Sequence, residues 1–196
     1  MTVWSTFGRR WAALPNASAA GPILKSYFDT LYVALTGDQT VAGVKTFSSN
    51  PVVSGGAIQF PATQVPSADV NALDDYEEGT FTPVVTGGTT GGTGTYSLQQ
   101  GLYTKIGDRV FVQIAITWTA HTGTGNLLIT GLPFTSAGGS ALTLVNSLLT
   151  YTSTPTAIAL GASTQIGIFE SATNAARTNI AIEAGADLRI AGHYLV

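Results

Sequence analysis

The sequence has no cysteine among its 196 residues, which excludes disulfide staples, thiolate zinc sites and a cysteine nucleophile. This absence also fits assembly in a reducing cytosol. Charged residues make up only 10% of the chain, against roughly 25% in average globular proteins. The net charge is -3 and the pI is about 5.1, so electrostatics indicates no nucleic-acid partner. No apolar run approaches the roughly 18 residues of a spanning helix, and we expect no membrane insertion.

Catalytic signatures are also scarce. His121 and His193 are far apart in the sequence and have no matching Asp or Cys partner, which favours ordinary turn or strand positions over a general base. The Gly-rich run 87–94 lacks the Lys-Ser/Thr pair and the helix of a phosphate-binding loop, so it predicts a flexible loop. No Gly-x-Ser-x-Gly nucleophile elbow occurs. We therefore predict a protein that is not an enzyme, with no catalytic residues, no cofactor and no metal.

The acidic run 74–78 (DDYEE) is the densest cluster of charge. Two carboxylates can cleave a glycosidic bond when they are held at set separations, but adjacent residues in a hinge point in divergent directions. A cation site is also open, although the run lacks the ligand-Gly-ligand order of a calcium loop. The pattern favours a structural role, in which the carboxylates bond backbone N–H groups or pair with Lys105 and Arg109.

Residues 22–72 have the pattern of an oligomeric shaft. Pro22 suits a first helical position, and apolar residues at steps of four and three predict a helix over 22–35 with a narrow apolar seam. An extended β stalk over 36–61 and a linker over 62–72 follow. A short helix and an unpaired extended run are marginal alone, so we expect them to associate with identical chains, although the helix could instead pack on its own domain. The predicted trimer-interface residues are Leu24, Phe28, Leu31, Leu35, Val41, Val44 and Phe47.

Residues 1–21 are too few to form a core, yet they are rich in Trp and Arg, which anchor interfaces. A disordered terminus and an export signal are the alternatives, but Pro15 and Asn16 interrupt the apolar run that a signal needs. We interpret this segment as an arm that docks on a larger partner. Its predicted docking residues are Trp4, Phe7, Arg9, Arg10 and Trp11.

Residues 73–196 alternate apolar and polar side chains in short segments separated by Gly-rich turns. Val110, Ile114 and Trp118 share one face of the clearest segment. Many short strands at such spacing predict an antiparallel β-sandwich of jelly-roll type. We expect strands over 80–85, 95–98, 102–106, 109–119, 126–129, 141–147, 149–152, 156–160, 165–170, 179–183 and 188–195. The whole chain is thus predicted to be mainly β, with one short helix.

Several runs resemble known proteins. The runs YFDTLY (27–32), LTGDQTVAGVKTF (35–47) and AIQFPATQ (57–64) resemble shaft segments of fibre proteins from tailed bacteriophages and prophages. The runs LDDYEEGTFTP (73–83), YTKIGDRV (103–110), GLPF (131–134) and RIAGHY (189–194) are similar to the head domain that follows such shafts. The resemblance covers about residues 27–196. The shaft is very short here, which fits a stubby tail fibre or a capsid-mounted fibre.

The resemblance implies a parallel homotrimer that is assembled in the bacterial host cytoplasm and carried on the virion. It implies that the N-terminal arm binds phage tail or capsid proteins and that the C-terminal head binds a glycan or protein of the host surface. Three alternatives of mounting and activity follow: a tail fibre, a capsid head fibre or decoration protein, and a polysaccharide-degrading tailspike.

Glycan recognition by a β-sandwich uses exposed aromatic rings that stack on sugars, with polar side chains around them. We expect such residues on loops at one end of the sandwich. For each of them, an ordinary packing role is the alternative. The receptor-binding candidates are Trp118, His121, Asn126, Phe134, Tyr151 and Asn174.

Overall fold

The computed structural model describes residues 42–53, 56–69 and 71–196. The chain divides into two compact units, Met1–Gly56 and Ala57–Val196. The predicted arm 1–21 and helix 22–35 lie outside the described residues. The second unit contains the predicted linker 62–72 as well as the predicted head 73–196.

The second unit is an antiparallel β domain of ten strands. Over the described residues the chain contains no helix, and so no helix there that is long and apolar enough to cross a membrane. The prediction of a mainly β chain with an antiparallel sheet is confirmed. The strands are β1 (Tyr76–Phe81), β2 (Val84–Gly87), β3 (Gly94–Ile106), β4 (Arg109–His121), β5 (Leu127–Thr130), β6 (Ser140–Ser147), β7 (Thr154–Ala159), β8 (Gln165–Ser171), β9 (Thr178–Asn179) and β10 (Ala186–Leu195).

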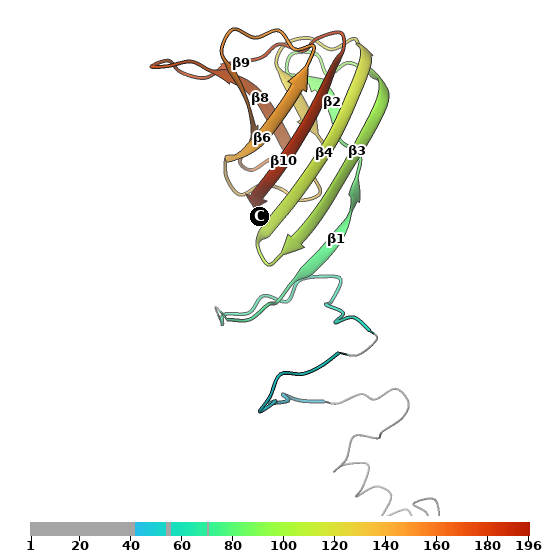
Figure 1. Ribbon diagram of the computed structural model, residues 1–196, viewed down its shortest axis with the longest axis vertical. Coiled ribbons are helices and arrows are strands. Elements are labelled where there is room, and N and C mark those ends of the chain that lie inside the picture. Colours follow the sequence, from blue (N-terminus) through green and yellow to red (C-terminus); the bar gives the residue numbers. More distant parts are fainter. Residues whose placement is uncertain (1–41, 54–55, 70) are drawn as a thin grey trace, which may run out of the picture. The chain divides into compact units, whose positions relative to one another are not determined.

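All strands belong to one curled sheet with the order β1-β3-β4-β10-β6-β7-β8-β5-β2, and β9 pairs with β8. Strand β6 forms the corner, because residues 143–147 pair with β10 whereas residues 140–142 pair with β7. A strand that changes partners in this way lets a sheet fold over on itself. The result is two layers: β1, β3, β4 and β10 in one, which faces the viewer in Figure 1, and β7, β8, β5 and β2 in the other.

The core lies between these layers and follows the alternation seen in the sequence. On β4 every second side chain from Val110 to Trp118 is buried, as the pattern predicted. Tyr194 of β10 is buried as well. Inward side chains of the opposite layer complete the core: Val85, Leu127, Ile129, Ala157, Ala159, Ile166 and Ile168.

Five predicted strands differ from the observed ones, and one of them, 179–183, is reduced to the two-residue strand β9 and a bridge at Ala181. The predicted strand 80–85 is split between β1 and β2 at Pro83, which has no N–H for a ladder. The predicted strands 95–98 and 102–106 form one strand, β3, because Gly101 does not interrupt it. A Cβ at Gly101 would lie 2.7 Å from the Phe81 ring, so this glycine lets the ring pack on the backbone of β3. Residues 149–152 form a loop instead of a strand.

The β domain has two distinct ends. At one end, here called the connector end, the predicted linker 62–72 (the connector) leads into β1. The Gly107 N–H donates to Asp75 O there, and the Val196 N–H donates to Asp108 O. At the opposite end, here called the distal end, lie the loops 88–93, 122–126, 148–153 and 172–177. Strand pairing places them together, since β3 begins where β4 ends, β10 begins beside the ends of β4 and β6, and β7 begins where β8 ends. Figure 1 shows the C-terminus at the lower, connector end.

A buried ion pair joins the connector to the domain. Lys105 and Asp75 form a salt bridge, and their exposed fractions are 4% and 1%. The Lys105 ammonium also donates to Gln64 Oε1 at 3.3 Å. Asp74 accepts the Ser67 N–H at 2.8 Å, and this bond lowers the pKa of the Asp74 carboxyl. The acidic run thus fixes the chain at this junction, which is the structural role that the sequence favoured.

Replacing Lys105 by Met should strongly destabilise the domain, because it leaves the Asp75 carboxylate buried without its counter-charge. We expect the free energy of unfolding to fall by about 3 to 5 kcal/mol, measured by urea denaturation at one fixed chain concentration. The matched control is Arg189→Met, which breaks the exposed pair with Asp187 and should cost less than about 1 kcal/mol. Equal losses in the two variants would contradict a special role for the buried pair.

Tyr194 closes the core near the C-terminus. Its hydroxyl donates to Phe134 O at 3.1 Å and accepts the Phe134 N–H at 3.3 Å. Burial raises the pKa of Tyr194 to about 12, since an ionised phenolate loses its hydration in the core.

This raised pKa predicts alkaline destabilisation. The unfolded phenol ionises near 10 whereas the folded one keeps its proton to about 12, so the contribution to stability is full below pH 10 and is lost as the pH rises through 12. The unfolding free energy of the wild-type chain should therefore fall more steeply over this range than that of Tyr194→Phe. At neutral pH the variant should lose about 1 kcal/mol. Identical pH slopes would refute the assignment.

Candidate functional site

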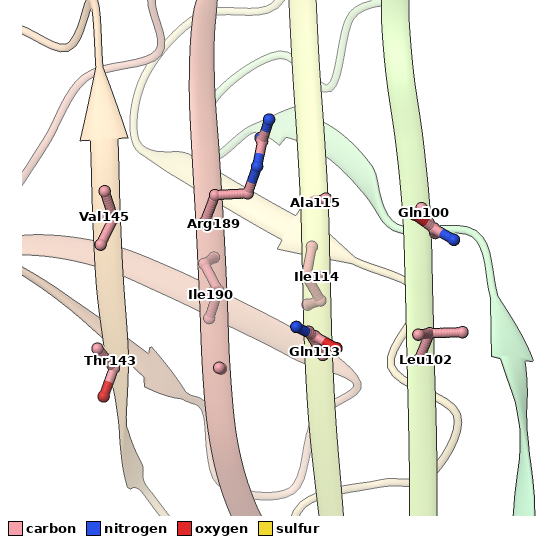
Figure 2. Close-up of a pocket in the computed structure, with 10 residues that line it drawn as sticks. Gln100, Leu102, Gln113, Ile114, Ala115, Thr143, Val145, Arg189 and Ile190 are labelled. Carbon is pink, nitrogen blue, oxygen red and sulfur yellow. The ribbon is translucent and has the colours of Figure 1, made fainter.

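The outer face of the first layer carries a shallow depression of about 270 Å³ across β3, β4, β10 and β6. Figure 2 shows the lining side chains on these four neighbouring strands, with Gln113 on β4 and Arg189 on β10. The lining side chains are amides, aliphatic groups and one guanidinium, and Arg189 is already paired with Asp187. The depression contains no carboxylate, imidazole or nucleophile pair, so it has the chemistry of a contact surface rather than of a catalytic site.

The distal end has a different composition. Its four loops are rich in Gly, Thr, Ala and Asn, and Arg177 is the only charged residue within them. Glu183 lies in the connection 180–185, which reaches the same end because Ala186 pairs with Trp118. The Arg177 guanidinium lies over the Phe169 ring, with Cζ 5.2 Å from the ring centroid. This end of the domain therefore presents hydroxyl, amide and backbone groups with little net charge.

Loop 148–153 is held by two carboxylates. Glu170 Oε2 accepts the N–H groups of Thr152 at 2.7 Å and Ser153 at 3.0 Å, and the Thr152 hydroxyl at 3.1 Å. Glu183 Oε1 accepts the Thr150 N–H at 3.2 Å. The residue between these anchored positions is Tyr151, which is 44% exposed. Two carboxylates thus hold the backbone on both sides of an exposed aromatic ring.

These hydrogen bonds depend on the charge of Glu170. The N–H groups of Thr152 and Ser153 lower its pKa from the ordinary value of 4.5, because they favour the ionised form. The carboxylate therefore contributes to loop order above this ordinary value, and its contribution is lost as the pH falls through the lowered pKa.

His121 and its neighbours close the open edge of the curled sheet. The His121 Nδ1 accepts the Gly123 N–H at 2.9 Å, so Nε2 carries the proton and donates to Val85 O at 3.1 Å. The Tyr96 hydroxyl accepts the Val85 N–H at 2.9 Å, and Gln99 Nε2 donates to a backbone carbonyl of the same edge at 2.8 Å. Side chains thus take the place of a strand ladder between β2 and β3.

The structure gathers four of the receptor-binding candidates at the distal end, namely His121, Asn126, Tyr151 and Asn174. Asn126, Tyr151 and Asn174 are exposed. Asn174 has φ +60° at the turn between β8 and β9, a conformation that Asn adopts more readily than most residues.

The other two candidates are placed differently. Trp118 is 1% exposed and its indole N–H donates to Glu183 O at 3.0 Å, so its ring belongs to the core. Phe134 lies at the connector end and packs edge-on against Tyr103. Neither ring is available at the distal surface.

Glu170 and Glu183 were missed by the sequence reasoning. The sequence feature that could have identified them is the scarcity of acidic residues after Asp108. An isolated acid in a nearly uncharged β segment has a high chance of serving a specific hydrogen-bonding role.

The predicted shaft leaves large apolar side chains uncovered in its described part. The predicted interface residues Val44 and Phe47 are 94% and 67% exposed. Five more large apolar residues between positions 52 and 73 are at least half exposed: Val52, Val53, Ile58, Val65 and Leu73. The remaining predicted interface residues (Leu24, Phe28, Leu31, Leu35 and Val41) and the docking residues (Trp4, Phe7, Arg9, Arg10 and Trp11) lie outside the described residues.

Comparison with known proteins does not identify a family. No protein-family model matches the chain, and a search of curated proteins finds none that matches it. Within residues 42–53, 56–69 and 71–196, no three His, Asp or Glu side chains lie close enough together to hold a metal ion.

Proposed function

We propose that this chain is a structural fibre protein of a tailed bacteriophage, which attaches to the virion through its N-terminus and adsorbs to the host cell surface through its distal loops. One observation supports the proposal above all. The described chain combines a run of uncovered apolar residues with a β domain whose neutral, exposed loops lie at the end opposite the connector. The uncovered apolar residues need other chains to bury them, whereas the distal loops remain accessible to a cell surface.

The proposed assembly is a parallel homotrimer with a jelly-roll-like head on each chain. The exposed positions at Val44 and Phe47 support association, because large apolar side chains in a continuous run are costly to leave in water. Identical neighbours would cover them at the same height along a shared axis. The proposed site of action is the virion, with phage tail proteins as partners of the N-terminal arm.

Two alternative functions differ from this proposal, one in the place of attachment on the particle and the other in enzymatic activity. A capsid head fibre or decoration protein would use the same head on a different part of the particle. A polysaccharide-degrading tailspike would need two carboxylates facing each other across a sugar groove. The described depression has no carboxylate, and Glu170 and Glu183 are engaged with backbone N–H groups, which favours binding over cleavage.

Phe47→Asp tests the association directly. In a single chain this exposed position tolerates a charge, whereas in a trimer the substitution places three carboxylates in an apolar contact. We expect native mass spectrometry to give three chains for the wild-type protein and a lower trimer stability for the variant. The control is Leu148→Asp, which changes a residue that is 78% exposed at the distal end and should leave the trimer intact. A monodisperse wild-type monomer would overturn the proposed assembly.

The full chain should compete with phage particles for the host surface. We expect the purified protein to reduce particle adsorption and to release no oligosaccharide from host capsular polysaccharide. A variant that lacks residues 1–21 should remain oligomeric and should still block adsorption, but it should no longer be incorporated into particles. Released oligosaccharide would favour the tailspike alternative, and antibody labelling of the capsid instead of the tail would favour the head fibre. Failure of the full chain to bind host cells would contradict an adsorption role.

A further inference from the structure

The geometry of loop 148–153 points to a binding site for uncharged carbohydrate at the distal end, with Tyr151 as the ring that stacks on the sugar. This inference rests on the proposed function and deepens it by naming the class of receptor. Three features of the distal end support it: the ring is exposed, the backbone beside it is hydrogen-bonded on both sides, and the four loops carry little charge.

Tyr151 is unusual among the exposed residues of its loop because its neighbours are fixed on both sides. Thr150, Thr152 and Ser153 donate their N–H groups to Glu183 and Glu170. Leu149 packs against the core and Leu148 has φ +64°. The ring is thus carried on a backbone with little freedom, and binding costs less conformational entropy when the contacting group is already in place. A rigid, half-exposed Tyr is the kind of group that stacks on the apolar face of a pyranose.

The charges around the ring decide the class of sugar. Glu170 accepts from Thr152, Ser153 and Thr178, and Glu183 accepts from Thr150. The one cation of the four loops, Arg177, is exposed, and its guanidinium lies over the Phe169 ring. A sialate or uronate needs an Arg or Lys that is free to pair with its carboxylate, and the loops 88–93, 122–126, 148–153 and 172–177 supply none beyond Arg177. Hydroxyl and amide groups remain, and these bond the hydroxyls of neutral sugars.

The sheet depression is less suited to this role. Arg189 in this depression is paired with Asp187, and no aromatic residue lines it. It offers no ring for a sugar to stack on, so the distal loop is the better site.

The experiment measures binding of the full-length oligomer to a panel of immobilised oligosaccharides. One half of the panel contains glucose, galactose and mannose oligomers, and the other half contains their uronate- or sialate-bearing counterparts. We expect binding to at least one neutral member and no dependence on added salt, since no ion pair forms. Tyr151→Ala should weaken this binding roughly tenfold, and Tyr151→Trp should retain it.

The control variant is Tyr76→Ala, which removes an exposed ring at the connector end and should leave the affinity unchanged. Glu170→Ala tests the positioning role, because it releases the loop without changing the ring, and it should weaken binding while the trimer persists. Preference for acidic sugars, binding to a protein receptor only, or full affinity in Tyr151→Ala would overturn the inference while adsorption itself still stands. Absence of any adsorption to cells would instead overturn the proposed function on which it depends.

Discussion

The apolar face of a single sheet is the constraint on which the β domain depends. Strands β4 and β10 each present a row of buried side chains, from Val110 to Trp118 and from Ala186 to Tyr194, and a sheet with such a face must be covered. The described chain has no helix to cover it. The same sheet therefore turns at β6 and returns as a second layer, whose inward residues fill the space above the first.

Covering a sheet with itself leaves edges that need a partner. At the β2 edge the partners are side chains, because Tyr96, Gln99 and His121 bond backbone groups that no neighbouring strand reaches. At the connector end, the buried pair of Asp75 and Lys105 fixes the chain where it enters β1. His121 bonds both the β2 edge and the N–H of Gly123 in distal loop 122–126. The same side chain therefore closes the sheet and fixes a loop of the distal surface.

The scarcity of charge gives the domain its particular surface. With so few ionisable groups, most of those in the β domain are occupied in holding the fold: Lys105 by Asp75, Glu170 and Glu183 by loop N–H groups, and Arg189 by Asp187. Apart from Arg177, the distal loops are uncharged and rich in hydroxyl groups. A surface of this kind makes stacking contacts and hydrogen bonds, which are less sensitive to salt than ion pairs.

Local alternation was enough to predict that the chain is mainly β and antiparallel, and to identify the inward face of β4, because a period of two is written in adjacent residues. The sequence also indicated that the acidic run is structural. Pairing decided the rest. Whether Trp118 faces solvent or core, whether 149–152 is a strand or a loop, and whether Glu170 meets Thr152 all depend on contacts between residues far apart in the chain. No local pattern encodes such contacts, since they arise only when the two layers close on each other.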